Sequence, residues 1–291
     1  MAPIFQRLAT LLTLLPTIAS ALPALTLRMN NPACRSPIAS RTTPVVLIHG
    51  LFGNKDNDLK RLGDWLEATH SFCTYSLTYG EQPQYPGVGG LKHIKETAPV
   101  IAAFINQVLA ETGARKVDLI GHSEGGLQSF YVPKFESSVK NKIRNIAALA
   151  PVSHGTTLQG INTIAYEGGP VTVSTIDLIL TTGGCEACID LRPDGAATVA
   201  LNTGPIIQKF VDKVLIIATQ YDALVTPVGT ASFINEPKVT NMFIQDRCPT
   251  DTAGHHNVVN DPNVWDLVAN FLDTSIPVPS VCVVGQTPLK N

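Results

Sequence analysis

The sequence predicts an α/β protein with a mostly parallel sheet and helices on both of its faces. Apolar, β-branched segments alternate with amphipathic segments of helical length, which is the pattern of βαβ units. The first strand candidate, 44–48, is apolar throughout, as expected for a strand that is buried on both faces. A length of 291 residues accommodates one large domain of this class.

The other elements follow in order along the chain. Helices are predicted over 57–70, 91–112, 125–135 and 262–272, and strands over 74–77, 116–120, 143–149, 213–219 and 239–245. The helix over 91–112 has the clearest signal, an apolar stripe at helical spacing with Gly113 after it as a C-terminal cap. Over 152–201 the periodicity fails, and an insertion of that size predicts a small cap or lid above the active site.

The first 21 residues predict a secretory signal peptide. Arg7 precedes an apolar run over 8–19, and the segment ends with small residues at Ala21. Pro16 interrupts the run, which is shorter than the roughly 20 apolar residues of a membrane span. We therefore expect residues 1–21 to be removed, residues 22–291 to form a single domain, and the protein to be secreted to the extracellular space.

Six cysteines in a secreted chain predict disulfide bonds. The sequence leaves many pairings open, and we expect the set that joins neighbours in the chain: Cys34–Cys73, Cys185–Cys188 and Cys248–Cys282. The Cys185–Cys188 pair could instead be redox-active or half of a zinc site, but no second pair of ligands accompanies it. We expect no metal and no cofactor. The net charge of −2 and the scattered basic residues argue against a nucleic-acid partner.

The segment Gly121-His122-Ser123-Glu124-Gly125 fits the G-x-S-x-G pattern between an apolar strand and a helix. Such a turn exposes the serine at the carboxyl end of the strand, and only glycine tolerates the close contacts on either side. The motif in this context predicts the α/β-hydrolase fold with Ser123 as nucleophile. The backbone N–H groups of Glu124 and Leu51 are the expected oxyanion donors. We interpret His49, just before Leu51, as a structural residue that holds the loop.

The acid and the base of such a site follow the nucleophile in the chain, with the acid first. Asp222 comes after the predicted strand 213–219 and is the expected acid, whereas Asp246 and Asp251 lie too close to the histidine in sequence. His255 and His256 both lie between the last predicted strand and the final helix, and periodicity does not choose between them.

The chain resembles the secreted class 2 lipases and esterases of actinomycetes and filamentous fungi, and more distantly the fungal B-type lipases. The resemblance rests on the segments 44–53, 117–126, 149–160, 218–227 and 244–251. It implies Ser123 as nucleophile, Asp222 as acid and His255, rather than His256, as base. Two differences stand out: Glu124 occupies a position where the family often has glutamine, and residues 161–200 match weakly.

The expected function is extracellular hydrolysis of carboxylic esters, acylglycerols or other acyl esters, through an acyl-serine intermediate. The expected partners are a small-molecule or lipid ester and, transiently, a lipid interface, and the expected state is a monomer. Alternatives are an enzyme acting on a polyester, lactone or secondary-metabolite ester, a peptidase or amidase, and a non-catalytic binding protein with the same fold.

Overall fold

The computed structural model describes residue 30 and residues 43–157 and 182–283. The predicted signal peptide, Cys34 and the middle of the predicted cap lie outside the described residues. The described part contains a parallel six-stranded sheet in the order β2-β1-β3-β4-β5-β6. The strands are β1 (Val45–Ile48), β2 (Thr74–Ser76), β3 (Val117–His122), β4 (Ile143–Leu149), β5 (Lys213–Ala218) and β6 (Val239–Phe243). The predicted fold class is confirmed.

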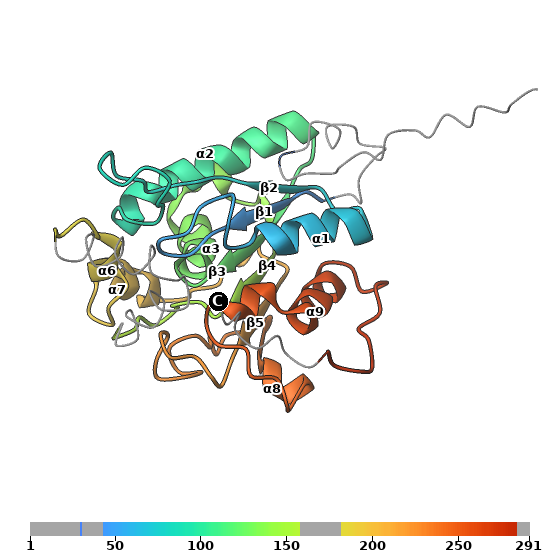
Figure 1. The fold of residues 1–291 in the computed structure, drawn as a ribbon. Coiled ribbons are helices and arrows are strands. Elements are labelled where there is room, and N and C mark those ends of the chain that lie inside the picture. Colours follow the sequence, from blue (N-terminus) through green and yellow to red (C-terminus); the bar gives the residue numbers. More distant parts are fainter. Residues whose placement is uncertain (1–29, 31–42, 158–181, 284–291) are drawn as a thin grey trace, which may run out of the picture.

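Helices cover both faces of this sheet (Figure 1). The bounds are α1 (Lys60–His70), α2 (Ile94–Thr112), α3 (Glu124–Phe135), α6 (Ala187–Asp190), α7 (Ala196–Asn202), α8 (Ile244–Arg247) and α9 (Pro262–Leu272), with 3-10 turns η2 (Ser137–Val139) and η3 (Asn257–Asn260). Side chains alternate along a strand, so Val46 and Ile48 of β1 pack against α2 and α3, whereas Val45 and Leu47 pack against α1 and α9.

The helix predicted over 57–70 begins only at Lys60. Asn54 and Asn57 form a turn in which the backbone N–H of Asn57 donates to the Asn54 carbonyl oxygen, 3.4 Å away, and to its side chain, 3.1 Å away. Side-chain bonds of this kind compete with helical hydrogen bonding. The segment before α1 is therefore a loop, and it places Asp58 at the carboxyl edge of the sheet.

Other predicted boundaries were also wrong, and for two of them the structure shows the physical reason. Helix α2 begins at Ile94 instead of residue 91, because the Ile94 N–H is capped by the carboxylate of Asp190, 2.9 Å away and 96 residues later. Strand β6 ends at Phe243 instead of residue 245, because Asp246 accepts a hydrogen bond from the Phe243 N–H at 2.8 Å and starts α8. The segment without clear periodicity contains the short helices α6 and α7.

Candidate active site

Ser123 lies in a sharp turn between β3 and α3. Its backbone has φ 54° and ψ −118°, a conformation that is rare for a residue with a side chain. The neighbouring glycines make the turn possible: a Cβ added at Gly121 would lie 2.2 Å from the Gly125 carbonyl oxygen, and one added at Gly125 would lie 2.0 Å from the Ile48 carbonyl oxygen. The predicted strand–turn–helix context of the motif is therefore present.

Asp222 and His255 form a buried pair next to this turn. The His255 Nδ1 lies 2.8 Å from Asp222 Oδ2, and the other carboxylate oxygen accepts the backbone N–H groups of Leu224 and Val225, each at 2.8 Å. Burial alone would raise the pKa of Asp222, but His255 and these hydrogen bonds outweigh burial and lower it. Asp222 is thus an ionised acceptor, and the His255 proton is held on Nδ1.

The loop after α8, residues 248–256, determines which histidine pairs with Asp222. We call it the His255 loop. Gly254 pairs with Tyr221 in an isolated bridge, and Ala253 accepts the hydroxyl of Thr219 through its carbonyl oxygen at 2.5 Å, so the loop is held against the end of β5. This arrangement directs His255, not His256, toward Asp222.

The two rival acids have other partners. Asp246 caps the Phe243 N–H, and Asp251 accepts the Ala253 N–H at 2.9 Å and the Asn263 side chain at 2.8 Å. Asp246 therefore holds the start of α8, and Asp251 joins the segments before and after His255.

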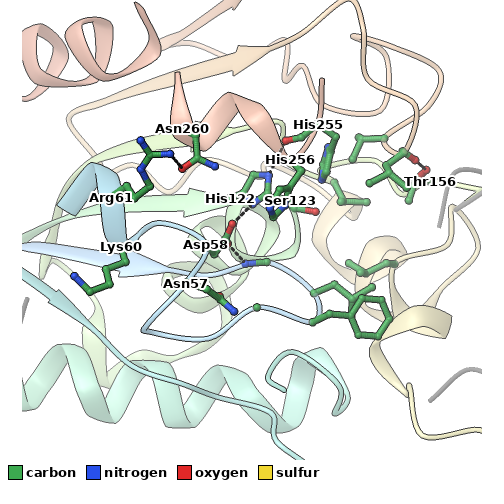
Figure 2. Close-up of a pocket in the computed structure, with 18 of the residues that line it drawn as sticks. Asn57, Asp58, Lys60, Arg61, His122, Ser123, Thr156, His255, His256 and Asn260 are labelled. Carbon is green, nitrogen blue, oxygen red and sulfur yellow. Dashed lines mark hydrogen bonds and ion pairs between the residues drawn. The ribbon is translucent and has the colours of Figure 1, made fainter. Parts of the chain in front are cut away.

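Ser123 and His255 line one cavity of about 440 Å³ at the carboxyl end of the sheet, the edge where α/β proteins bind ligands. Its walls differ in chemistry. Six apolar side chains contribute to them: Leu51, Phe52, Val152, Leu191, Leu224 and Val225. Figure 2 shows Ser123 between a polar side with Lys60, Arg61 and Asn260 and the opposite side with Thr156. Thr156 bonds to the backbone of Leu191 and Leu224, which places apolar residues on its side.

The loop after β1 borders the cavity near Ser123. Gly50 and Gly53 are joined by a hydrogen bond of 3.0 Å, and the Phe52 N–H donates to Gly89 at 3.0 Å. The Leu51 N–H lies between them and donates to no group within the described part of the chain. His49 holds this loop as expected: its Nδ1 lies 2.8 Å from the Gly50 carbonyl oxygen, and its ring stacks on Tyr79.

Glu124 follows Ser123, and its backbone N–H is the first of α3, where helical acceptors are missing. Its side chain is fully buried and does not line the cavity. Burial raises the pKa of Glu124 well above its ordinary value, and the neighbouring Tyr79 hydroxyl opposes this only in part. Burial therefore favours the neutral form of this carboxyl.

Asp58 and His122 belong to the site, although no sequence pattern singled them out for it. In the sequence His122 is a variable position of the motif, and Asp58 lies within the predicted helix 57–70. In the structure the Nδ1 of His122 lies 2.8 Å from Oδ1 of Asp58, and the two side chains form an ion pair. The pair is buried, since the side chains of His122 and Asp58 are only 4% and 5% exposed. Nothing local in the sequence marks a pair that is 64 residues apart.

Two of the three expected disulfide bonds are present, Cys185–Cys188 and Cys248–Cys282. Cys73 is also disulfide-bonded, but Cys34 lies outside the described residues, so that pairing stays a prediction. In the described ranges, no cluster of three or more His, Cys, Asp or Glu side chains could hold a metal ion. Within the same ranges, no helix is both long and apolar enough to cross a bilayer.

Comparison with known proteins agrees with this geometry. A family model described as alpha/beta hydrolase fold matches residues 43–164. A triacylglycerol lipase from Pseudarthrobacter phenanthrenivorans is 32% identical over 99 residues, which cover 32% of this chain and 29% of that protein. A triacylglycerol lipase from Vibrio cholerae is 29% identical over 157 residues, covering 53% of this chain and 46% of that protein. The matches thus span less than half the length of these relatives.

Solved structures show the same fold at low identity. Lipase B from Aspergillus fumigatus aligns with a TM-score of 0.62 and 18% identity, over 82% of this chain and 54% of that protein. The 2-hydroxy-6-oxo-6-phenylhexa-2,4-dienoate hydrolase from a Rhodococcus species aligns with a TM-score of 0.54 and 14% identity, over 83% and 90%. The chain therefore has the α/β-hydrolase fold, and triacylglycerol lipases are among its sequence relatives.

Proposed function

We propose that this protein hydrolyses carboxylic esters through an acyl-enzyme formed on Ser123. The observation that carries the proposal is the buried hydrogen bond between Asp222 and His255, beside a serine in a strained turn on the wall of the same cavity. A nucleophile, a base and a group that orients the base are the set that acyl transfer requires.

In the proposed reaction the Ser123 hydroxyl attacks the ester carbonyl carbon while His255 Nε2 accepts its proton. Asp222 keeps the other ring proton on Nδ1 and stabilises the imidazolium that forms. The N–H groups of Leu51 and Glu124 donate to the carbonyl oxygen as it becomes negative. His255 then protonates the departing alcohol, and a water molecule deprotonated by His255 releases the acid and restores Ser123.

The cavity supports an amphipathic ester as substrate. Its apolar walls suit an acyl chain, and transferring such a chain from water gains about 0.8 kcal/mol for each buried CH₂ group. The polar side, with Lys60, Arg61 and Asn260, suits the alcohol portion. An acylglycerol or another acyl ester has this division. We also propose that the protein is exported, which the pattern of residues 1–21 and the disulfide bonds support.

The test is hydrolysis of p-nitrophenyl esters from acetate to palmitate by the mature chain from residue 22, beside Ser123→Ala. We expect turnover with a preference among acyl lengths, its loss in Ser123→Ala, and labelling of Ser123 by a fluorophosphonate. A folded protein that hydrolyses none of these esters and resists the probe would contradict the proposal and favour a binding role.

A further inference from the structure

The ring of His122 contacts a hydrogen-bond acceptor on each side. Its Nδ1 lies 2.8 Å from the carboxylate of Asp58, and its Nε2 lies 3.1 Å from the backbone carbonyl oxygen of His255. A neutral imidazole has one donor and one acceptor nitrogen, whereas an imidazolium donates from both. Satisfying both partners therefore requires a His122 cation, although the side chain is buried.

His49 provides an internal contrast in the same part of the molecule. Its Nδ1 faces the Gly50 carbonyl oxygen at 2.8 Å, but its Nε2 accepts the backbone N–H of Tyr79 at 3.3 Å. One donor and one acceptor nitrogen make a neutral ring. Burial lowers the pKa of His49. For His122 burial acts in the same direction, but Asp58 outweighs it and raises the pKa.

Asp58 extends the contact to the loop after β1, residues 49–53, which we call the oxyanion loop because it carries the expected oxyanion donor Leu51. Its second carboxylate oxygen accepts the backbone N–H of Gly50 at 2.6 Å. Burial alone would raise the pKa of Asp58, but the His122 cation outweighs burial and lowers it, so the carboxylate is ionised. Three hydrogen bonds thus connect Gly50, Asp58, His122 and the backbone of His255, as Figure 2 shows for the labelled members.

We propose that Asp58 and His122 are positioning residues that fix the oxyanion loop and the His255 loop relative to Ser123. The inference rests on the proposed esterase function. Gly50 immediately precedes Leu51, the expected oxyanion donor, and His122 immediately precedes Ser123. The pair therefore holds the segments that carry the nucleophile, the base and an oxyanion donor in one buried network. Small errors in such positions reduce catalysis strongly.

The charge of His122 is set by groups from several segments. The ionisable side chains that face it, or face its partner Asp58, are Asp58 itself, Asp222, His49, His255 and His256. Of these, Asp58 alone forms a side-chain ion pair with His122 within the described residues. Asp58→Asn keeps the shape of the side chain and removes the charge, so the buried ring becomes neutral and gives up one of its two donated bonds.

The first experiment compares kcat and KM for Asp58→Asn and the unmodified protein, with kcat divided by the concentration of active sites titrated with a fluorophosphonate. The loss of a buried charge-assisted hydrogen bond predicts about a 10- to 100-fold lower kcat. KM is expected to stay within about twofold, because four of the six apolar side chains of the cavity wall lie outside the loop that Asp58 holds. Asp212→Asn is the control, since Asp212 pairs with Lys116 at the opposite end of the sheet.

The second experiment reads the charge of His122 directly, by nitrogen NMR of the histidine rings in Ser123→Ala. We expect doubly protonated signals that persist above the ordinary histidine pKa of about 6.5 and disappear in His122→Gln, and a neutral His49 in the same spectrum. A neutral His122, or an Asp58→Asn protein with unchanged kcat per active site, would overturn this inference while leaving the esterase proposal intact. A chain without esterase activity would overturn both.

Discussion

Replacing Glu124 by glutamine tests the electrostatics behind the oxyanion loop. The carboxyl is fully buried, and neither oxygen has a hydrogen-bond partner in the described part of the chain. It lies so close to Gly90 that a Cβ added there would come within 2.7 Å of Oε2. Glutamine has nearly the same shape and never carries a charge, so Glu124→Gln changes the titration and little else.

The magnitude follows from the raised pKa of Glu124. The folded state keeps a proton that the unfolded chain releases above about pH 4.3. The free energy of unfolding of the unmodified protein therefore falls by about 1.4 kcal/mol for each pH unit above that value, until the folded pKa is reached. Glu124→Gln escapes this loss. Its advantage over the unmodified protein should therefore grow by about 1.4 kcal/mol for each pH unit above about 4.3, up to the folded pKa.

Urea unfolding at several pH values, followed by tryptophan fluorescence, measures the difference between the two proteins. Burial and neighbouring Asp251 raise the pKa of Asp261 to about 7, but Asp261 is present in both proteins, so its effect cancels in the difference. Glu96→Gln removes an exposed carboxyl and controls for the change in net charge. If the difference between Glu124→Gln and the unmodified protein does not change with pH, Glu124 is ionised in the folded state and the reasoning is wrong.

Four further changes test other parts of the structure. Asp222→Asn should lower kcat per titrated site by about 10³- to 10⁴-fold and change KM little, because Asp222 does not line the cavity; a decrease of less than tenfold would contradict its role. Gly125→Ala places a Cβ 2.0 Å from the Ile48 carbonyl oxygen, so we expect a loss of more than about 3 kcal/mol of stability or insoluble protein. Gly113→Ala, which has open space around it, should lose only about 1 kcal/mol by the same unfolding assay. Replacing both Cys248 and Cys282 by serine opens a link across 34 residues, and chain entropy predicts a loss of about 3–4 kcal/mol, seen as a lower thermal midpoint.

The fold could be predicted because its signals are local. Buried parallel strands are short apolar runs, and the stripe on α2 has an unambiguous period. Ser123, Asp222 and His255 could be proposed for a related reason. Each stands just after a strand or in the loop before the last helix, and a parallel sheet gathers these points at one edge.

The boundaries and the second Asp–His pair depend on contacts between distant segments. The start of α2 depends on a cap from Asp190, and the end of β6 on the carboxylate of Asp246. Asp58 stands among several Asn and Asp residues in an exposed stretch, where composition alone indicates a turn. Only the packed structure shows that its side chain faces inward and pairs with His122.

His49 and His122 show why residue type does not determine a role in this site. Both are buried histidines directly after or at the end of neighbouring parallel strands, β1 and β3, and both precede a residue expected to take part in catalysis within two positions. Their partners differ by one group: His49 faces a backbone N–H where His122 faces a carboxylate. That difference makes the first ring neutral and the second a cation. The neutral ring can hold one loop, whereas the cation can bind two acceptors at once and so connect two loops across the nucleophile.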